Sequence, residues 1–596
     1  MSPKQVLFQR TTARTTARRT TERPWYRFEH LVALLACSAG LACAPAVPTP
    51  TADPRSNATT ATTPPAPRTL VMATRNEPDT LAEALGGGLN LASPIRLFNA
   101  GLAIVDARGV SHAYLAEGLP TLNSASWTVA PDGTMETTYK LRANLTWHDG
   151  TPLTPKDFVF AWRVYAIPQL GVATSAPNAH IDSVVAVDDR TVLIKWKRPY
   201  PKADALTGAQ GGFLPLPRHI LERQLDPSTP EAFASLSFWS RDYVGLGPYR
   251  LDRWEPGGFI EAAAFADHVL GRPKIDRIRI EFIPDPNTVL ANLLAGTVQL
   301  ADDSSLGFSQ AAVIKREWEP NRAGSVLLSP SLLRMVQVQL KPDTVNPRAM
   351  LDLRVRQALA SAIDKAALSE GLFEGQGIDA SSLVVPNVSY YDAVDPAVTK
   401  YPYDPRRSEE LMSQAGFAKR GEAFVSESSE RFSPEAWFIA GGDNEKEFTI
   451  VADGWRQAGF DVRPRGLSSA QNLDYQLKAS FPAVLNTAVG VGEAAYRHLS
   501  TSGMPTAANN WRGGVNQGGW SNPEYDRLLD SFNTTLDRDQ QVQQVAQMMK
   551  LVSEELPWIP MYFRLRVVAH TSALTGPQPT APESVNFDNV HQWEMR

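Results

Sequence analysis

The chain has 596 residues, which is too long for one compact core and predicts two or more domains. Its content of 43% hydrophobic and 20% charged residues is typical of globular proteins. The formal charge of −5 is unevenly distributed along the chain, because residues 1–30 hold seven Lys or Arg against two Glu. The rest of the chain is therefore acidic, which argues against general nucleic-acid binding.

The first apolar stretch contains both cysteines, Cys37 and Cys43. The remainder of the chain therefore has no disulfide, no thiolate metal site and no cysteine nucleophile. Residues 1–30 are rich in Arg and Thr, residues 31–47 are apolar, and Pro, Thr and Ala follow. This order predicts a secretory signal rather than a membrane-spanning helix of about 20 residues, so we expect an extracytoplasmic protein.

Each cysteine ends a segment that resembles part of a lipobox, in which the cysteine becomes lipidated. Cys37 has the better upstream leucine, whereas Cys43 follows a more suitable apolar length and directly precedes a Pro/Thr-rich segment. We favour Cys43, with residues 1–43 as the leader; lipidation of Cys37, or cleavage without a lipid, are the alternatives. Residues 44–67 cannot bury a core and are predicted to form a flexible, partly extended linker.

Strands in the folded body are predicted from runs of apolar and alternating residues. They cover residues 69–73, the segment that ends at 141, a hairpin over 184–196, residues 278–282 and residues 483–489. Asp149-Gly150 predicts a turn after the second of these strands, because glycine adopts positive φ without steric cost.

Helices are predicted where a capping residue precedes an apolar stripe. They begin at Pro155, Pro286, Leu351 and Pro405, and the third is expected to run unbroken to residue 370. At the first of them, Thr154 and Asp157 have the spacing of a capping box, with Asp in place of Glu.

Several segments resemble, in the same order, the signatures of the bacterial extracytoplasmic solute-binding proteins of family 5, the dipeptide-, oligopeptide- and nickel-binding group. The segments are Lys140–Arg142 with His148–Gly150, Pro152–Thr154, Asp157 and Phe160; GLGPYRLDRWEPG (245–257); DLRVRQALASAIDKAAL (352–368); YPYDP (401–405); WSNPEYDRLLD (520–530); and LPWIPMYF (556–563). The resemblance extends from about residue 68 to residue 576.

This resemblance implies a mixed α/β, two-lobed fold of the type II periplasmic-binding-protein class with a ligand cleft between the lobes. It places lobe I at residues 68–325 with 567–596, and lobe II at residues 326–566. Hinge closure would enclose a small solute such as a peptide, because ligand that contacts both lobes favours the closed state. The implied partners are the permease and ATPase subunits of an ABC importer; a monomer without cofactor is expected.

The ligand segment departs from the family pattern. Peptide binders carry an Asp-Tyr-Asp-Pro segment whose first Asp holds the ammonium group of the peptide, and residues 483–499 at the corresponding place lack it. Glu493 is the one carboxylate of that segment. It is the candidate to replace the Asp as partner of a cationic ligand group; the alternatives are that peptide binding is lost or that Glu493 is a solvated loop residue. The predicted ligand contacts are Tyr390, Tyr391, Gly490, Glu493 and Tyr496.

Motifs of catalysis and cofactor binding are missing from the sequence, which has no G-x-S-x-G, H-E-x-x-H, C-x-x-C or Walker loop. Residues 490–495 fit a loose dinucleotide pattern, but the acidic residue required about twenty positions later is missing, so a glycine-rich loop that lines a cleft is favoured. His148-Asp149 is interpreted as a structural turn, because two adjacent side chains alone make no metal site.

Two other classes of protein stay open at this point. A secreted hydrolase would need a nucleophile and base pair that the sequence does not display. A cell-surface receptor or adhesion lipoprotein would share the anchor and the fold without transport. The sequence therefore favours a solute-binding protein that is not an enzyme.

Overall fold

The computed structural model of the protein describes residues 68–596 apart from 83–84, 86–92, 174–175, 208–211, 512–513, 581 and 583–586. The predicted leader and linker, and with them Cys43, lie outside the described residues. The rest of the chain mixes strands and helices, as expected. None of the described helices combines the length and apolar character needed to cross a bilayer.

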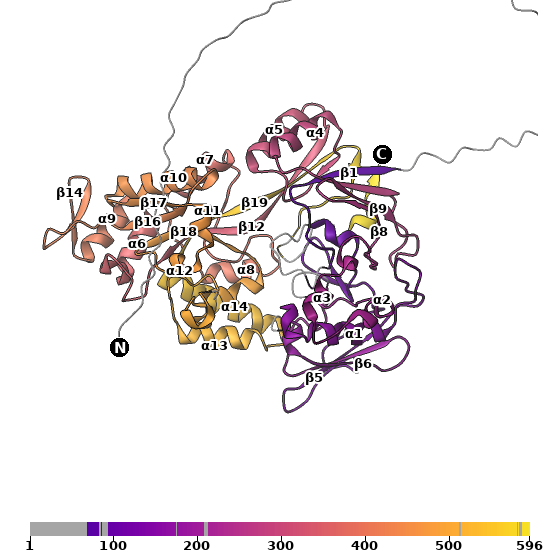
Figure 1. Ribbon diagram of the computed structural model, residues 1–596. Coiled ribbons are helices and arrows are strands. Elements are labelled where there is room, and N and C mark those ends of the chain that lie inside the picture. The colour runs from indigo at the N-terminus through magenta and orange to yellow at the C-terminus, as the bar shows by residue number, and fades with distance from the viewer. Residues whose placement is uncertain are drawn as a thin grey trace, which may run out of the picture. The chain divides into compact units, whose positions relative to one another are not determined.

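One large mixed sheet runs through the folded body (Figure 1). Its strands in spatial order are β17 (Arg463–Leu467), β16 (Glu435–Ile439), β18 (Val484–Gly490), β12 (Gly324–Val338), β19 (Trp558–Thr571), β11 (Leu300–Ala301), β1 (Thr69–Thr74), β10 (Arg277–Phe282), β9 (Phe259–Ala264) and β8 (Tyr249–Glu255), and β13 (Ile378–Asp379) also pairs with β19. The strands predicted at 69–73, 278–282 and 483–489 are confirmed as β1, β10 and β18.

The two long strands β12 and β19 join the halves of this sheet. They pair antiparallel from Gly324 opposite Thr571 to Gln337 opposite Trp558. Toward one end β19 also pairs with β11, and toward the other end β12 pairs with β18. A register shift follows Pro330, which has no N–H to donate to the ladder. The predicted lobe boundaries, 325/326 and 566/567, fall within these two strands and stay a prediction.

A smaller antiparallel sheet forms a separate core. Its strands are β4 (Trp127–Val129), β5 (Met135–Lys140), β7 (Thr191–Trp196) and β6 (Ile181–Ala186), and α1 (Pro155–Tyr165) packs against it. The predicted hairpin and the predicted strand before residue 141 are confirmed. Oδ2 of Asp157 accepts hydrogen bonds from the N–H (2.8 Å) and the hydroxyl (3.0 Å) of Thr154, so the predicted cap of α1 is present as well.

Two further helices follow their sequence caps. In α4 (Pro286–Ala295), Asp285 accepts from the Thr288 N–H at 2.7 Å, and Gly296 ends the helix at φ 72°. In α9 (Pro405–Gln414), Asp404 accepts from the Arg407 N–H at 3.0 Å. These caps are local in sequence, so their helices are predictable from short windows.

The single helix predicted over residues 351–370 is wrong. The chain forms α6 (Leu353–Ser361) and α7 (Lys365–Phe373), with a break between them. Oδ1 of Asp364 accepts from the Ala367 N–H at 2.9 Å and caps the second helix. An aspartate inside an apolar helical pattern can thus end one helix and begin another, because its side chain replaces a backbone acceptor.

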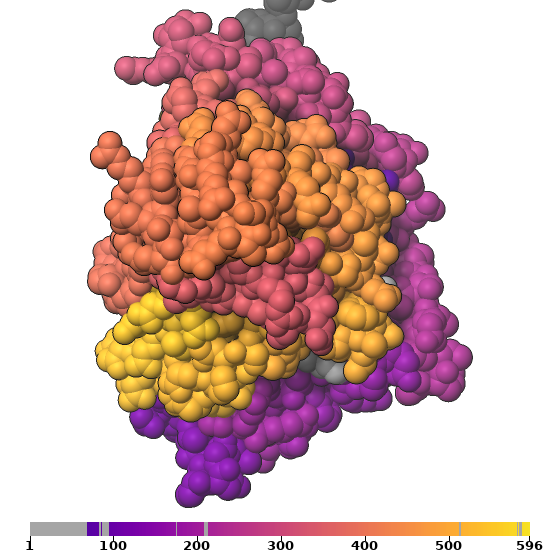
Figure 2. Space-filling view, turned by 90° about the vertical axis from the view of Figure 1, so that its left-hand side faces the viewer, coloured from indigo at the N-terminus to yellow at the C-terminus, as the bar shows by residue number. Residues whose placement is uncertain are grey.

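The remaining elements cover the sheets or connect them. The helices are α2 (Arg218–Leu221), α3 (Pro230–Ala234), α5 (Phe308–Trp318), α8 (Tyr391–Val394), α10 (Asp443–Ala458), α11 (Ser469–Leu473), α12 (Tyr475–Lys478), α13 (Pro523–Phe532) and α14 (Arg538–Glu555), and the strands are β2 (Ala103–Val105), β3 (Ser111–Ala113), β14 (Phe417–Arg420), β15 (Ala423–Ser426), β20 (Leu574–Thr575) and β21 (Glu594–Met595). In Figure 2 the gold surface of the α13–α14 region adjoins the purple surface of the N-terminal part, and Leu536 packs against the core of the smaller sheet.

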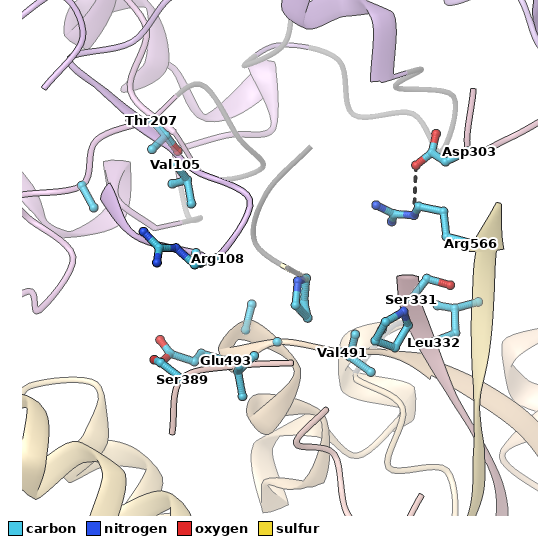
Figure 3. A pocket seen from close by; sticks show the side chains of 18 of the residues that line it. Val105, Arg108, Thr207, Asp303, Ser331, Leu332, Ser389, Val491, Glu493 and Arg566 are labelled. Atoms are coloured by element: carbon cyan, nitrogen blue, oxygen red, sulfur yellow. Dashed lines mark ion pairs between the residues drawn. The ribbon is translucent and has the colours of Figure 1, made fainter. Parts of the chain in front are cut away.

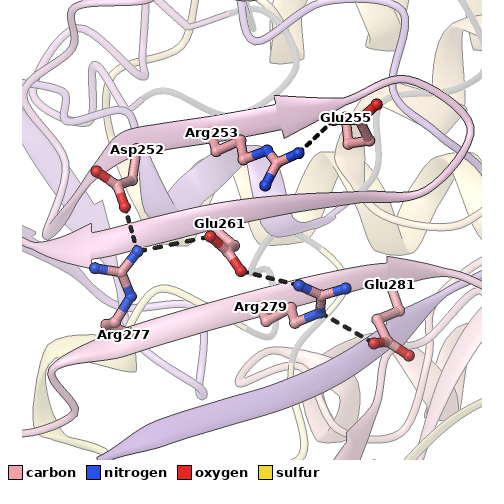
Figure 4. A network of polar contacts seen from close by, with 7 residues as sticks. All are labelled: Asp252, Arg253, Glu255, Glu261, Arg277, Arg279 and Glu281. Carbon is pink, nitrogen blue, oxygen red and sulfur yellow. Dashed lines mark hydrogen bonds and ion pairs between the residues drawn. The ribbon is translucent and has the colours of Figure 1, made fainter. Parts of the chain in front are cut away.

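The outer face of β8, β9 and β10 carries a network of charged side chains (Figure 4). Arg277 pairs with Asp252 and Glu261, and Arg279 pairs with Glu261 at 2.9 Å and with Glu281 at 3.1 Å. The opposite face of β10 buries Ile278 and Ile280. Each exposed pair contributes little stability. The charged side chains on the edge strand β8 and its neighbours disfavour edge-to-edge pairing with a strand of another chain.

His148 of the predicted turn has a structural role. Its ring is 8% exposed; Nε2 lies 3.0 Å from the carbonyl oxygen of Gly247, and Nδ1 accepts from the Gly245 N–H at 3.2 Å. This arrangement requires the neutral ring with the proton on Nε2. Burial lowers the pKa of His148 to about 4. The turn therefore holds residues 245–247 by hydrogen bonds, a structural role that agrees with its interpretation as a structural turn.

Acid should destabilise the protein through this histidine. Below pH 6.5 the unfolded chain takes up a proton at His148, whereas the folded chain does so only near pH 4, so the free energy of unfolding falls as the pH drops through this window. The loss is on the order of 3 kcal/mol for this group. Urea denaturation at pH 7.5, 5.5 and 4.5 should show a shallower pH dependence for His148→Gln than for the wild type.

The exposed His112 supplies the matched control. His112→Gln should keep the wild-type pH dependence, and an unchanged dependence in His148→Gln would contradict the assigned role.

Candidate ligand-binding cleft

A cleft of about 1640 Å³ opens where strands of the large sheet end or bend. Residues from β1, β11, β12, β18 and β19 or from the loops that follow them line it, together with loops near residues 105–111 and 200–207. Figure 3 shows Arg108 and Thr207 across the cleft from Glu493 and Ser389. The volume exceeds the roughly 300–1,000 Å³ of common small-molecule pockets, so the cleft has room for an extended solute.

Glu493 lies at the wall of the cleft and is 8% exposed. Its two carboxylate oxygens meet Nζ of Lys202 at 3.0 Å and Nη2 of Arg538 at 2.7 Å. Burial raises the pKa of Glu493, but the two positive charges outweigh burial and hold the pKa below its ordinary value. Glu493 is thus ionised and already paired, and the alternative of a solvated loop residue does not fit its burial.

Gly490 and Tyr390 also line the cleft, and their contact with a ligand stays a prediction. Gly490 ends β18 and leads into the turn that carries Glu493. The guanidinium of Arg538 lies over the ring of Tyr390, 4.9 Å from its centroid, a cation–π contact that orients both side chains.

Tyr496 and Tyr391 are not among the residues that line the cleft. Tyr496 is fully buried; its hydroxyl lies 3.0 Å from the hydroxyl of Tyr390, and its carbonyl accepts from the hydroxyl of Tyr525 at 2.7 Å. Tyr391 begins α8 and donates to Asp395 at 3.0 Å. The structure therefore brings Tyr390, Gly490 and Glu493 together at the cleft and places Tyr496 behind its wall.

Sequence reasoning missed the basic floor of the cleft. Arg566 of β19 pairs with Asp303 at 2.9 Å, and Arg564 and Arg75 line the same space. From the sequence, Arg564 and Arg566 are interpreted as solvated or paired structural groups, and Arg75 carries no prediction. The sequence does contain a signal for them, because Arg564 and Arg566 alternate with apolar residues in β19. Charged side chains at every second position of a buried strand must face water or a polar space.

A buried ion pair supports the wall formed by β12. Nε and Nη2 of Arg334 each lie 2.7 Å from a different oxygen of Glu447, and the hydroxyl of Tyr562 donates to the same carboxylate. Asn486 adds a hydrogen bond at 3.3 Å. Burial lowers the pKa of Arg334, but the charge and hydrogen bonds of Glu447 outweigh it and raise the pKa. The pair is bidentate and charge-assisted, the strongest class of side-chain hydrogen bond.

Breaking this pair should be costly. Arg334→Met leaves Glu447 buried without its cation, so we expect a loss of about 3–5 kcal/mol in the free energy of unfolding, measured by urea denaturation. Arg334→Met combined with Glu447→Gln should recover part of the loss.

Arg456→Met serves as control, because Arg456 and its partner Asp453 are exposed and should contribute about 1 kcal/mol or less. Equal losses for Arg334→Met and Arg456→Met would show that the buried pair does not hold the wall.

Residues 120–509 match the family described as bacterial extracellular solute-binding proteins, family 5. The chain belongs to this family. The glutathione-binding protein GsiB of Escherichia coli K12 is 25% identical over 481 residues, which cover 77% of this chain and 83% of that protein. A Brucella ovis protein named as a peptide-binding protein of an ABC transporter is 29% identical over 300 residues, or 49% of this chain; the match spans about half the length (51%) of that relative.

The fold agrees with this membership. The oligopeptide-binding protein AppA of Bacillus subtilis, solved in complex with a nonapeptide, superimposes with a TM-score of 0.65 at 20% identity, covering 89% of this chain and all of AppA. The predicted two-lobed periplasmic-binding-protein fold is thereby confirmed. Within the described residues, no group of three His, Cys, Asp or Glu side chains is arranged to hold a metal ion.

Proposed function

We propose that this family 5 protein is the extracytoplasmic solute-binding component of an ABC importer, which captures a peptide-like solute and delivers it to a membrane permease. The observation that carries the proposal is the cleft of about 1640 Å³, which is lined from both sides of the β12–β19 crossing. The names of the Brucella ovis and Escherichia coli relatives, a peptide binder and a glutathione binder, support the peptide-like class.

Capture rests on the two proposed lobes, residues 68–325 with 567–596 and residues 326–566. A solute that contacts both lobes favours the closed arrangement, since its binding energy is greatest when both walls are in reach. Lys202 belongs to the first proposed lobe and Glu493 to the second, so their 3.0 Å ion pair bridges the cleft. Binding and release need no covalent step, and we expect no turnover of the solute.

Binding should compact the protein. We expect mass spectrometry of the native-host protein to identify a co-purified peptide-like solute, and calorimetry to show that the stripped protein rebinds it. Small-angle X-ray scattering should then give a smaller radius of gyration with solute than without it. A co-purified solute unrelated to peptides would contradict the proposed class. If binding is proven but the radius of gyration does not change, closure is contradicted and the proposed solute-binding function stands.

The anchor is a separate part of the proposal. Residues 1–43 would direct export, a lipid on Cys43 would hold the protein at the membrane, and residues 44–67 would give it reach toward the permease. Cys43→Ala should shift the protein from the membrane fraction to the soluble fraction after cell lysis. If Cys37→Ala releases the protein and Cys43→Ala does not, Cys37 carries the lipid.

A further inference from the structure

Two arginines at the floor of the cleft have no carboxylate partner among the described residues. Arg75 follows β1 and is half-buried, and its buried Nε makes no hydrogen bond. Arg564 lies on β19, lines the cleft and is exposed. A buried guanidinium N–H without an acceptor is costly, so Arg75 is a group that a ligand can satisfy.

The register of the sheet brings the end of β1 beside the Asp303–Arg566 pair, and Arg75 and Arg564 both line the cleft there. Ala73 of β1 lies opposite Ala301 of β11. The segments that follow these two strands stay in contact, because the Arg75 N–H donates to Oγ of Ser304 at 3.1 Å. Asp303, next to Ser304, pairs with Arg566 of β19. Arg564 lies two residues from Arg566 and therefore on the same face of β19. The end of β1 and the middle of β19, almost 500 residues apart in sequence, thus both contribute to the floor.

The charge of the described lining is unbalanced. It contains eight arginines and lysines against four aspartates and glutamates. Asp303 is paired with Arg566, and Glu493 is shared between Lys202 and Arg538.

Two more of the lining arginines are neutralised from behind the wall, Arg334 by Glu447 and Arg96 by Asp588. After this pairing, Arg75, Arg108 and Arg564 remain among the lining cations, and Asp204 and Asp443 remain among the lining anions. Arg108 lies 3.9 Å from Asp106, and burial raises the pKa of Asp204. Among the described residues, Arg75 and Arg564 are therefore the lining cations without an ion pair. Uncompensated charge in a partly enclosed space attracts ligands of the opposite sign.

We propose that Arg75 and Arg564 form an anion subsite at the floor of the cleft and that the cleft selects solutes carrying carboxylates, acidic peptides before neutral ones. This inference rests on the proposed function. A guanidinium presents a planar fork of N–H donors that matches a carboxylate. The charge of Glu493 is already neutralised by Lys202 and Arg538. A cationic ligand group therefore gains less binding free energy at the wall than an anionic group gains at the floor.

A tetrapeptide library tests the subsite. The library combines Ala, Leu, Gln, Glu and Lys at every position, in free-acid and C-terminal amide forms, and is offered to the full-length protein after bound solute has been removed. Mass spectrometry reads the enrichment, and calorimetry compares the best Glu-containing peptide with its Gln isostere. We expect the Glu peptide to bind about tenfold or more tightly, since a hydrogen bond to a charged group is stronger than one between neutral groups.

Variants assign the preference to the two arginines. The double variant Arg75→Met/Arg564→Met should lose the preference for Glu over Gln while it still binds the Gln peptide, and Arg456→Met should keep the preference. Loss of enrichment for Glu at internal positions assigns the subsite to a side-chain carboxylate. Loss of the difference between free-acid and amide forms assigns it to the peptide C-terminus.

Three results would overturn the inference. Equal binding of Glu and Gln peptides together with equal binding of free-acid and amide forms by the wild type, or preferences that stay unchanged in the double variant, removes the anion subsite and leaves the proposed function intact. Enrichment of no peptide at all contradicts the peptide-binding function itself, and the subsite proposal fails with it.

Discussion

The antiparallel ladder between β12 and β19 is the constraint on which the cleft depends. Each strand pairs with its partner and with a further strand in one half of the sheet, so the backbone hydrogen bonds of both halves meet in this ladder. The register shift after Pro330 interrupts it at the level of the cleft, where Ser331 and Leu332 line the space. A bulge bends the strand and changes the direction of its side chains, so side chains of β12 can point into the cleft at this level.

Ion pairs in the cleft fall into two groups with different physical roles. The Arg334–Glu447 pair is almost fully buried and is completed by Tyr562, so it fixes the wall, and loss of either partner would leave a charge without compensation. The pairs of Glu493 with Lys202 and Arg538 join segments from both sides of the crossing. Their cations are about half exposed, so solvent and ligand can compete for them and the contact can open and close.

The local elements and the family can be recognised in the amino-acid sequence alone. Caps such as Thr154 with Asp157, and Asp285 with Thr288, involve neighbours within a few residues, so short windows predict them. The same locality explains the error over residues 351–370, where an apolar stripe continues past a capping Asp364. The glycine-rich turn with Gly490 and Glu493 was located from its place in the order of motifs, and it does line the cleft.

The charge of the site, in contrast, follows from the way the chain folds. Arg75, Lys202, Arg538 and Arg564 come from four different elements or loops, and no local pattern relates them. Whether Glu493 is free, solvated or paired depends on the two cations that folding brings to it, and whether Tyr496 faces ligand or core depends on packing against Tyr390 and Tyr525. Residue type indicates which charge a side chain carries, but the partners that neutralise it are chosen by the fold.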